Sequence, residues 1–349
     1  MKSILTYTLS LFFILSAASC LRDGESATSR LLSSVSGSSG ELVVVIDKTL
    51  WDSQEGLKIQ EIFQSAVPAL PQYEPMFNLL QINMAGFGKL FQNHRNIIFV
   101  TVDPAVAESK VTYQTDTYAA TQVLFKVIGP DAGSVLKTIE TNKQLIFDKI
   151  LSTERERWMR YYLKTQSSHE FNRLKDQHGI SMPVPAGYRV EESEPGFAWI
   201  SLETPVSTQS VLIHYFKASG SSVFTRDSMM LFRDELTLTK VPGPTVGTYM
   251  AIEERYPVEY KVFNYNGRNY AEIRGLWTLI NGFMGGPFIT LMTYDEKNRR
   301  VVMLDGFVYA PGEDKRELIR QVEALLYTAD FHSPEEAVVI GKKPKEKKK

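Results

Sequence analysis

Carboxylates are the residues of this sequence that could most directly support catalysis, since many hydrolases cleave glycosidic bonds with two facing Asp or Glu side chains. The acidic residues that cluster in the sequence do so over short stretches, at residues 191–194 (Glu-Glu-Ser-Glu) and in the doublet Glu253-Glu254. Adjacent residues of a strand point to opposite faces of a sheet, so neither group is a facing pair by itself. We therefore predict no catalytic residue. A hydrolase whose carboxylates come from separate strands is the alternative.

Metal binding and nucleophilic catalysis lack the motifs that they need. The sequence has no His-Glu-x-x-His motif, no Gly-x-Ser-x-Gly turn, and no glycine followed by Lys-Ser or Lys-Thr, as a phosphate-binding loop requires. A single cysteine excludes a Cys-based zinc cluster. We predict neither a metal site nor a cofactor. The histidines, none of which has metal-ligand spacing, are His94, His169, His178, His214 and His332.

A glycine-rich loop is the best candidate for a binding surface. In residues 281–287, three glycines and a proline surround one Phe and one Met. Such a backbone bends easily and could present these apolar side chains to a partner or a lipid-like ligand. In the alternative, this segment only connects two strands, and its Phe and Met belong to the core. Arg274 would then form a structural pair with Glu259. The candidate binding residues are Asn281, Phe283, Met284 and Arg274.

The composition is typical of a globular protein. Of 349 residues, 43% are hydrophobic and 23% are charged, which excludes a disordered chain, a collagen-like chain and a multi-span membrane protein. The net charge of −1 conceals an asymmetry. Setting aside Lys2 and residues 341–349, which hold six Lys and one Glu, leaves 32 basic and 39 acidic residues, or −7. A body of this charge is a poor partner for nucleic acid, which needs many cations to neutralise its phosphates.

Residues 1–19 predict a lipoprotein signal peptide. Lys2 precedes a compact apolar run at 9–15, and small residues at 16–19 lead to Cys20. The apolar run is too short for a membrane-spanning helix, which takes about 20 residues. The position of Cys20 resembles a bacterial lipobox, in which the thiol is acylated. An anchor with two or three acyl chains is stable, because each buried CH₂ contributes about 0.8 kcal/mol.

We therefore expect the protein at the bacterial outer membrane, anchored through lipid on Cys20. A Ser/Gly-rich tether, residues 20–40, would link the anchor to the body. The sequence does not decide between the periplasmic and the surface face of the outer membrane, because residues 21–25 (Leu-Arg-Asp-Gly-Glu) match the pattern of surface-exported lipoproteins only in part. The Lys-rich tail, residues 332–349, is expected to be mobile. Its alternative is contact with anionic lipid or phosphate groups.

The body divides into two predicted lobes, an N-terminal α/β lobe at 41–179 and a C-terminal α+β lobe at 180–331. Hydrophobic periodicity predicts strands and helices in both. In the first lobe we expect a strand at 42–47, a helix around 57–63, strands at 77–84, 96–102 and 118–127, and a long helical segment at 132–178. In the second we expect strands at 188–192, 196–202 and 210–217, a helix at 225–235, a five-strand β-meander from Gly247 and a closing helix at 313–328.

These elements predict an α+β fold of two lobes, with mostly antiparallel sheets, packed helices and the long helical segment between them. That segment could be two consecutive helices or one long bent helix. Thr153-Glu154-Arg155-Glu156 has the pattern of a capping box and offers a second helix start. Gly179 and the prolines that follow it end the segment.

Asn266-Gly267 predicts a β-hairpin with a type I′ turn. A two-residue loop sets the register, so Lys261 faces Glu272 and Glu259 faces Arg274. Opposite charges across two strands stabilise such a pairing. The other face of the hairpin is predicted to be core. On it Val262 is opposite Ala271 and Tyr260 is opposite Ile273, and Trp277 follows further along the strand.

The chain resembles a known family in several places. They are the lipid signal, Val43-Val44-Val45-Ile46-Asp47, and Arg274-Gly275-Leu276-Trp277 leading to Met284-Gly285-Gly286-Pro287-Phe288. These stretches are similar to Bacteroides-type lipoproteins of domain-of-unknown-function family 4837. The resemblance covers nearly all of the mature chain and implies an envelope lipoprotein. It implies no activity, ligand or catalytic residue.

We predict a lipid-anchored cell-envelope protein that is a non-catalytic binding or assembly module. Its partners would be the membrane, through the anchor, and an envelope protein or a glycan or lipid component, with no nucleic acid. The alternative function is an envelope hydrolase with carboxylates from separate strands.

Overall fold

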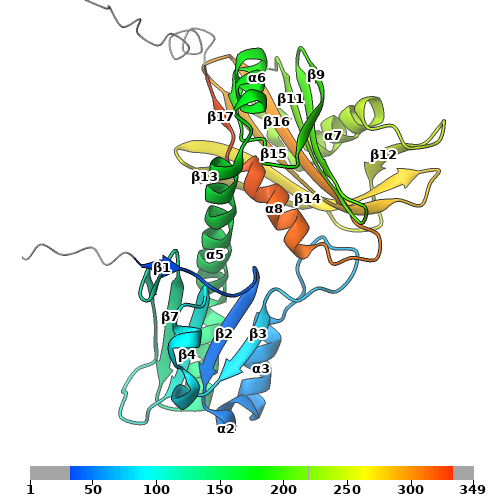
Figure 1. The fold of residues 1–349 in the computed structure, drawn as a ribbon. Helices are drawn as coiled ribbons and strands as arrows, with labels where there is room; N and C mark the ends of the chain where they lie inside the picture. The colour runs from blue at the N-terminus through cyan, green and yellow to red at the C-terminus, as the bar shows by residue number, and fades with distance from the viewer. Residues whose placement is uncertain (1–31, 219, 333–349) are drawn as a thin grey trace, which may run out of the picture. The chain divides into compact units, whose positions relative to one another are not determined.

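The protein has the predicted α+β fold, with two lobes and a long helix between them (Figure 1). The computed structural model describes residues 32–218 and 220–332. From Ser34 onward these residues belong to one compact unit. The predicted signal peptide, Cys20 and the tail beyond His332 lie outside the described residues.

The first lobe is built on a five-stranded sheet. Its strands are β2 (Glu41–Ile46), β3 (Asn78–Ile82), β4 (Asn96–Val102), β5 (Lys110–Thr115) and β7 (Val123–Gly129), in the order β3-β2-β4-β7-β5. The pairs β2–β3, β2–β4 and β4–β7 are parallel, and β5 pairs antiparallel with β7. The β-branched run of β2 is buried on both faces because it is an inner strand of a covered parallel sheet. The sequence did not predict β5.

Helices and a short-helix segment cover the two faces of this sheet. On one face, α3 (Gln54–Phe63) and α5 (Ala132–Thr165) pack over a core that includes Phe63 and Ile146. On the other face, Phe87 and Phe91 of the segment with η1 (Met84–Gly86) and α4 (Lys89–Gln92) pack against Phe99. The remaining short elements are β1 (Ser33–Ser34), α2 (Lys48–Trp51) and β6 (Ala119–Ala120).

Residues 34–40, which the sequence assigns to the tether, pack on this lobe instead. The Ser36 amide donates to the Asn93 carbonyl at 2.8 Å, and the Arg95 amide donates to the Ser36 carbonyl at 3.1 Å. Serine and glycine indicated flexibility, but backbone hydrogen bonds to a neighbouring segment order a chain whatever its side chains are. The predicted tether therefore ends before residue 34.

The long helical segment is two helices, α5 and α6 (Ser168–His178), separated at 166–167. The second start predicted at Thr153 is wrong. The Thr153 hydroxyl donates to the Lys149 carbonyl inside an uninterrupted helix. Glu156, the carboxylate of the expected capping box, is exposed and lies 3.6 Å from Arg160 one turn further along the same helix. The signal that ends α6 is the one predicted, because Gly179 has a left-handed φ of 64°.

The second lobe is an antiparallel half-barrel of eight strands. In sheet order these are β12 (Tyr249–Ile252), β14 (Arg268–Ile280), β15 (Gly285–Asp295), β16 (Arg300–Tyr309), β11 (Thr208–Phe216), β10 (Phe197–Glu203) and β9 (Arg189–Glu194), with β13 (Glu259–Tyr265) also beside β14. The five strands after Gly247 are present, but β12 does not pair with β13. The 13-residue β14 is long enough to pair with both along different parts of its length. A separate two-stranded sheet joins β8 (Ile180–Ser181) to β17 (Asp330–Phe331).

The hairpin between β13 and β14 has the predicted register. Lys261 is opposite Glu272, with 3.1 Å between Nζ and Oε1, and Glu259 is opposite Arg274. Asn266 has a φ of 50°, as the first position of a type I′ turn requires.

The core face predicted for this hairpin is wrong for β13 and incomplete for β14. Val262 is 61% exposed on the edge strand β13, whereas Ala271 opposite it is 2% exposed. On the face predicted to be charged and exposed, Glu272 is only 2% exposed. The alternation of residue types shows two faces of a hairpin, but helices on both sides of the sheet bury both faces of β14.

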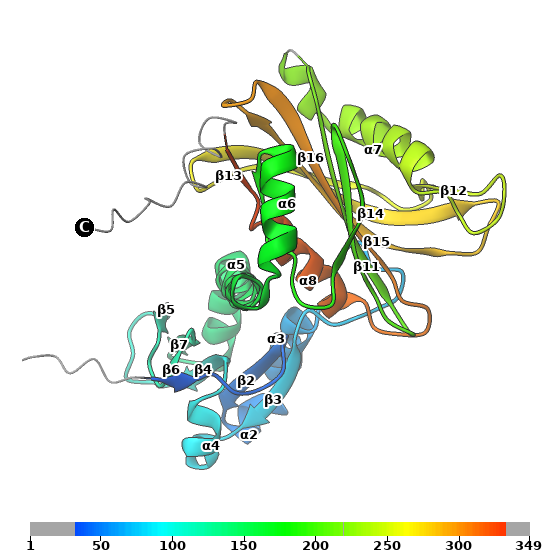
Figure 2. The same cartoon turned by 45° about the horizontal axis from the view of Figure 1, so that its top comes forward.

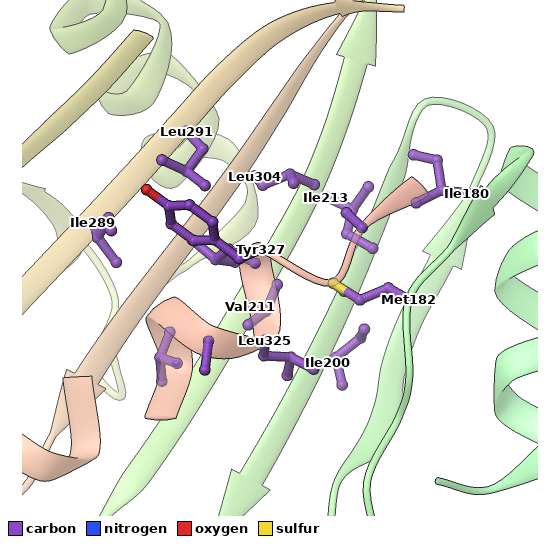
Figure 3. Close-up of a cluster of buried hydrophobic side chains, with 14 of the residues drawn as sticks. Ile180, Met182, Ile200, Val211, Ile213, Ile289, Leu291, Leu304, Leu325 and Tyr327 are labelled. Atoms are coloured by element: carbon purple, nitrogen blue, oxygen red, sulfur yellow. The ribbon is translucent and has the colours of Figure 1, made fainter. Parts of the chain in front are cut away.

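Those helices are α7 (Arg226–Lys240) and α8 (Arg316–Leu326), which lie on opposite faces of the sheet (Figure 2). The predicted closing helix corresponds to α8, and Ile319, Val322 and Leu325 of its expected apolar face are buried. Figure 3 shows Leu325 and Tyr327 among Ile213, Leu304 and other side chains of the strands. A short 3-10 helix, η2 (Ser221–Phe224), precedes α7.

A carboxylate of the first lobe caps the first turn of α8. The buried side chain of Glu74 accepts hydrogen bonds from the backbone amides of Lys315 and Arg316, both at 2.7 Å. The Lys315 side chain makes no capping hydrogen bond. A negative group at a helix N-terminus satisfies free N–H groups and interacts favourably with the helix dipole. Glu74 therefore ties the two lobes together where α8 begins.

Candidate functional site

A cavity of about 780 Å³ lies between the two lobes. Helix α5 forms one wall, and β13, β14 and α8 form the opposite wall, with the loop around Pro68 at one side. Its size is typical of small-molecule sites, which are about 300–1,000 Å³. We therefore take this cavity as the candidate functional site. The side chains that define its chemistry are Leu151, Arg155, Trp158, Lys261, Phe263, Tyr265, Arg274, Glu323 and Tyr327.

A network of five charged side chains lies at one wall of the cavity, and four of them, Arg155, Lys261, Arg274 and Glu323, line it. Arg274 is at its centre: Nη1 and Nη2 donate to the Glu323 carboxylate at 3.1 and 2.9 Å, and Nε donates to Glu272. Arg155 of α5 donates to the same Glu323 carboxylate at 2.9 Å, and Lys261 pairs with Glu272 at 3.1 Å. Three cations therefore share two carboxylates, which leaves one positive charge in excess.

The protonation of this network follows from its ion pairs. Burial alone would raise the pKa of Glu323, but Arg274 and Arg155 outweigh burial and lower it to about 2. Burial likewise opposes the charge on Arg274, but Glu272 and Glu323 raise its pKa well above the ordinary value. Both groups are therefore charged at neutral pH.

Aromatic rings form the wall beside the charges. Tyr327 lies at the centre of this wall: the Arg155 guanidinium stacks over its ring at 3.9 Å, and the ring centroids of Phe263 and Tyr265 lie 5.9 and 4.9 Å away. Trp158 of α5 also lines the cavity. The site therefore combines a charged part with a broad apolar surface, as an amphipathic ligand would require.

The predicted binding residues divide between two places. Arg274 lines the cavity, and its ion pairs are with Glu272 and Glu323. Glu259 is opposite Arg274 in the strand register, as predicted. Asn281 and Phe283 lie at the tip of the turn between β14 and β15, outside the cavity. The structure therefore does not bring Arg274 together with the loop.

The tip of this loop is apolar and exposed. Phe283 and Val246 of a neighbouring loop are both fully exposed, and the Asn281 side-chain amide donates to the Gly247 carbonyl at 3.2 Å. Met284 is half-buried and packs on the core beneath α7. Binding of a partner by this loop stays a prediction, and Phe283 is the side chain best placed for it.

The glycines that follow the tip have a packing role. Gly286 lies in β15, and a Cβ there would be 2.0 Å from the Val308 carbonyl oxygen. The Trp277 indole donates to the same oxygen at 3.1 Å, which makes Trp277 the core residue that the sequence predicts. Only glycine allows such a close approach of two strands. For this part of the loop, the structural interpretation is the better supported one.

The histidines have ordinary hydrogen-bond partners. Nε2 of His178 lies 2.8 Å from the Ser193 hydroxyl, and Nδ1 of His214 lies 3.0 Å from the Gly196 carbonyl. Within residues 32–332, with 219 excepted, no three His, Cys, Asp or Glu side chains are grouped to hold a metal ion. None of the helices in that part of the chain is both long and apolar enough to cross a membrane.

Two family models match the chain, one for each half. Residues 167–328 match the family described as "Domain of unknown function (DUF4837)", and residues 35–162 match "Domain of unknown function (DUF8532)". The chain therefore contains these two domains in tandem, and they meet where α5 ends and α6 begins. The predicted domain of unknown function 4837 is confirmed for residues 167–328, while its attribution to Bacteroides-type lipoproteins stays a prediction. The resemblance was expected to cover nearly all of the mature chain, and this extent is wrong. Residues 43–47, which were part of the resemblance, lie in the stretch that matches the other family.

Similarity to solved structures is weak. The Ran-binding protein Mog1p of Saccharomyces cerevisiae is similar to 45% of this chain and 92% of its own, with 8% identity and a TM-score of 0.30. The human StarD13 (DLC2) lipid transfer and protein localization domain is similar over 41% and 89%, with 11% identity and a TM-score of 0.18. TM-scores of this size do not establish a common fold. No curated protein matches the chain significantly.

Proposed function

We propose that this protein is a lipid-anchored binding module of the bacterial cell envelope, and that its ligand occupies the cavity between the lobes. The observation that carries the proposal is the cavity of about 780 Å³, which joins a charged wall to an aromatic one. A Glu74 cap across the lobes holds one end of this arrangement in place. A preformed cavity of this kind lowers the entropy cost of binding.

The charge state of the network supports binding more than hydrolysis. A glycosidase needs one carboxyl group with a raised pKa that can donate a proton. Arg274 and Arg155 instead lower the pKa of Glu323 to about 2, despite its burial, so this side chain stays ionised. Glu272 forms ion pairs with Arg274 and Lys261. These carboxylates serve as partners for cations and are poorly suited to acid catalysis.

Membrane attachment rests on the sequence alone and can be tested at Cys20. We expect the wild-type protein, expressed in its bacterial host, to partition into the detergent phase of a Triton X-114 extraction. Cys20→Ala should move it to the aqueous phase, because the acyl chains are then absent. A wild-type protein found in the aqueous phase would show that Cys20 carries no lipid.

Occupancy of the cavity can be tested with a substitution that fills it. Ser152 of α5 lines the cavity, whereas Glu156 lies on the exposed side of the same helix. We expect protein purified gently from native membranes to carry a small molecule that native mass spectrometry detects. Ser152→Phe should lose this mass, and Glu156→Phe should keep it, with similar melting temperatures for the two variants. Equal retention by both variants, or a wild type without bound mass, would contradict the proposal.

A further inference from the structure

Hydrogen-bond donors are in excess in the charged wall of the cavity. Each oxygen of the Glu323 carboxylate accepts from Arg274, and one accepts from Arg155 as well. Both Glu272 oxygens also have donors, from Arg274 and Lys261 on one and the Tyr327 hydroxyl on the other. The acceptors of this network are therefore already engaged within the protein.

The donors of the network are only partly used. The Lys261 ammonium has three N–H groups, and Glu272 is the carboxylate that it contacts; its side chain is 55% exposed. The Arg155 guanidinium has five N–H groups, of which one nitrogen contacts Glu323. The Arg155 side chain lines the cavity and is partly exposed, so its guanidinium can donate to a ligand there. A ligand that enters here meets donors and a net positive charge.

The other acidic groups of the cavity do not cancel this charge. Glu154 is paired with both Arg95 and Arg157, at 3.1 and 2.8 Å. Asp148 and Glu259 are exposed at the rim. Water and salt screen these two carboxylates and the exposed Lys261 more than they screen Arg155, whose side chain is only 21% exposed. The favourable place for an anion is therefore next to Lys261 and Arg155.

Apolar side chains line the cavity from both lobes. Leu151 and Trp158 of α5 face into it from the first lobe side, together with Met76, and Phe263 and Ile319 line it from the second lobe. Such a surface favours burial of a hydrocarbon chain, because each CH₂ group that leaves water for an apolar surface contributes to binding.

We propose that the cavity binds a single-chain amphiphile with an anionic head, a carboxylate or a phosphate monoester. The head contacts Lys261 and Arg155, and the chain lies along Leu151, Trp158 and Phe263. This inference rests on the proposed function, since it names the ligand class of the same cavity. A free fatty acid and a single-chain phospholipid share this chemistry.

Four probes with the same twelve-carbon chain separate the possibilities. Laurate and dodecyl phosphate are anionic, dodecyltrimethylammonium is cationic and dodecyl maltoside is neutral. We expect calorimetric titration of the delipidated protein, below the critical micelle concentration of each probe, to give dissociation constants at least tenfold lower for the anionic probes. The ratio of the dissociation constants for laurate and dodecyl phosphate shows whether the site prefers a fatty acid or a phosphate-bearing lipid.

A charge variant tests the position of the head. Lys261→Met keeps the length of the side chain but removes its charge, and it should weaken binding of the anionic probes about tenfold without changing the neutral one. Lys164→Met, an exposed lysine of α5 outside the cavity, is the matched control and should bind like the wild type. Melting temperatures verify that both variants are folded.

The outcomes distinguish the two proposals. Equal binding of all four probes, or a Lys261→Met variant that binds laurate and dodecyl phosphate like the wild type, would overturn the anionic-head inference while the cavity remained a binding site. No binding of any probe, combined with no bound mass in protein from native membranes, would overturn the proposed function itself.

Discussion

Asp305→Ala is expected to lower the free energy of unfolding by about 3–5 kcal/mol. Asp305 of β16 and Arg233 of α7 are both completely buried, with 2.8 Å between the carboxylate and Nε. The Arg233 guanidinium also stacks on the Phe288 ring at 3.8 Å. Removal of the carboxylate leaves a buried cation without its counter-charge, and the lost hydration of that cation is not recovered. In thermal unfolding the melting temperature should fall by about 10 °C.

Two controls separate the cost of an unpaired charge from other effects. The double variant Arg233→Met/Asp305→Leu removes both charges and should recover most of the lost stability, because apolar side chains of similar size replace a buried pair well. Glu156→Ala breaks an exposed pair with Arg160 and should change stability by less than about 0.5 kcal/mol. A single variant as stable as the double one would show that the pair is not isolated from solvent.

Glu323→Gln is expected to cost about 3 kcal/mol of unfolding free energy at pH 7, and less as the pH falls. Burial opposes ionisation of Glu323, but Arg274 and Arg155 lower its pKa in the folded protein to about 2, from an ordinary value of 4.5. A lowered pKa contributes stability that is fully present above pH 4.5 and is lost as the pH falls through about 2. Each unit of pKa difference corresponds to about 1.4 kcal/mol.

The measurement is urea denaturation of the wild type and Glu323→Gln at several pH values between 7 and 2.5. The difference in unfolding free energy between the two proteins should be constant from pH 7 to about pH 5 and should then narrow. Glu156→Gln, a conservative change at an exposed site, accounts for the general acid sensitivity of the protein. A difference that stays constant down to pH 2.5 would mean that the Arg274 and Arg155 pairs do not stabilise the ionised form.

The sequence is most informative where interactions are local. The two-residue Asn266-Gly267 turn sets which residues of β13 and β14 are opposite. Pairing starts at the turn, and each residue further along β13 is opposite the next residue along β14. The same turn is sufficient to predict that Lys261 lies beside Glu272. Burial is not predictable in the same way, since whether Val262 or Glu272 is covered depends on helices that come from elsewhere in the chain.

The cavity could not be predicted, because its residues are far apart in the chain. Arg155 and Glu323 are separated by 168 positions, and each looks like an ordinary charge on an amphipathic helix. Their contact depends on how the first lobe and α8 pack, for which Glu74 supplies a cap that no local pattern indicates. The sequence associates Arg274 with the loop at 281–287, but the structure places Arg274 in the cavity.

By itself, the sequence determined most of the longer helices and strands of both lobes, though not β5, and the register of the β13–β14 hairpin. It also contains the lipobox-like segment ending at Cys20. These depend on turn residues, on hydrophobic periodicity and on short linear patterns, all of which act within a few residues of the chain. Only the tertiary structure decided which face of each strand is buried, that Arg233 pairs with Asp305, and that Arg155 joins Arg274 at a cavity. Such contacts join residues from distant parts of the chain, and the energy of each depends on surroundings that the fold alone creates.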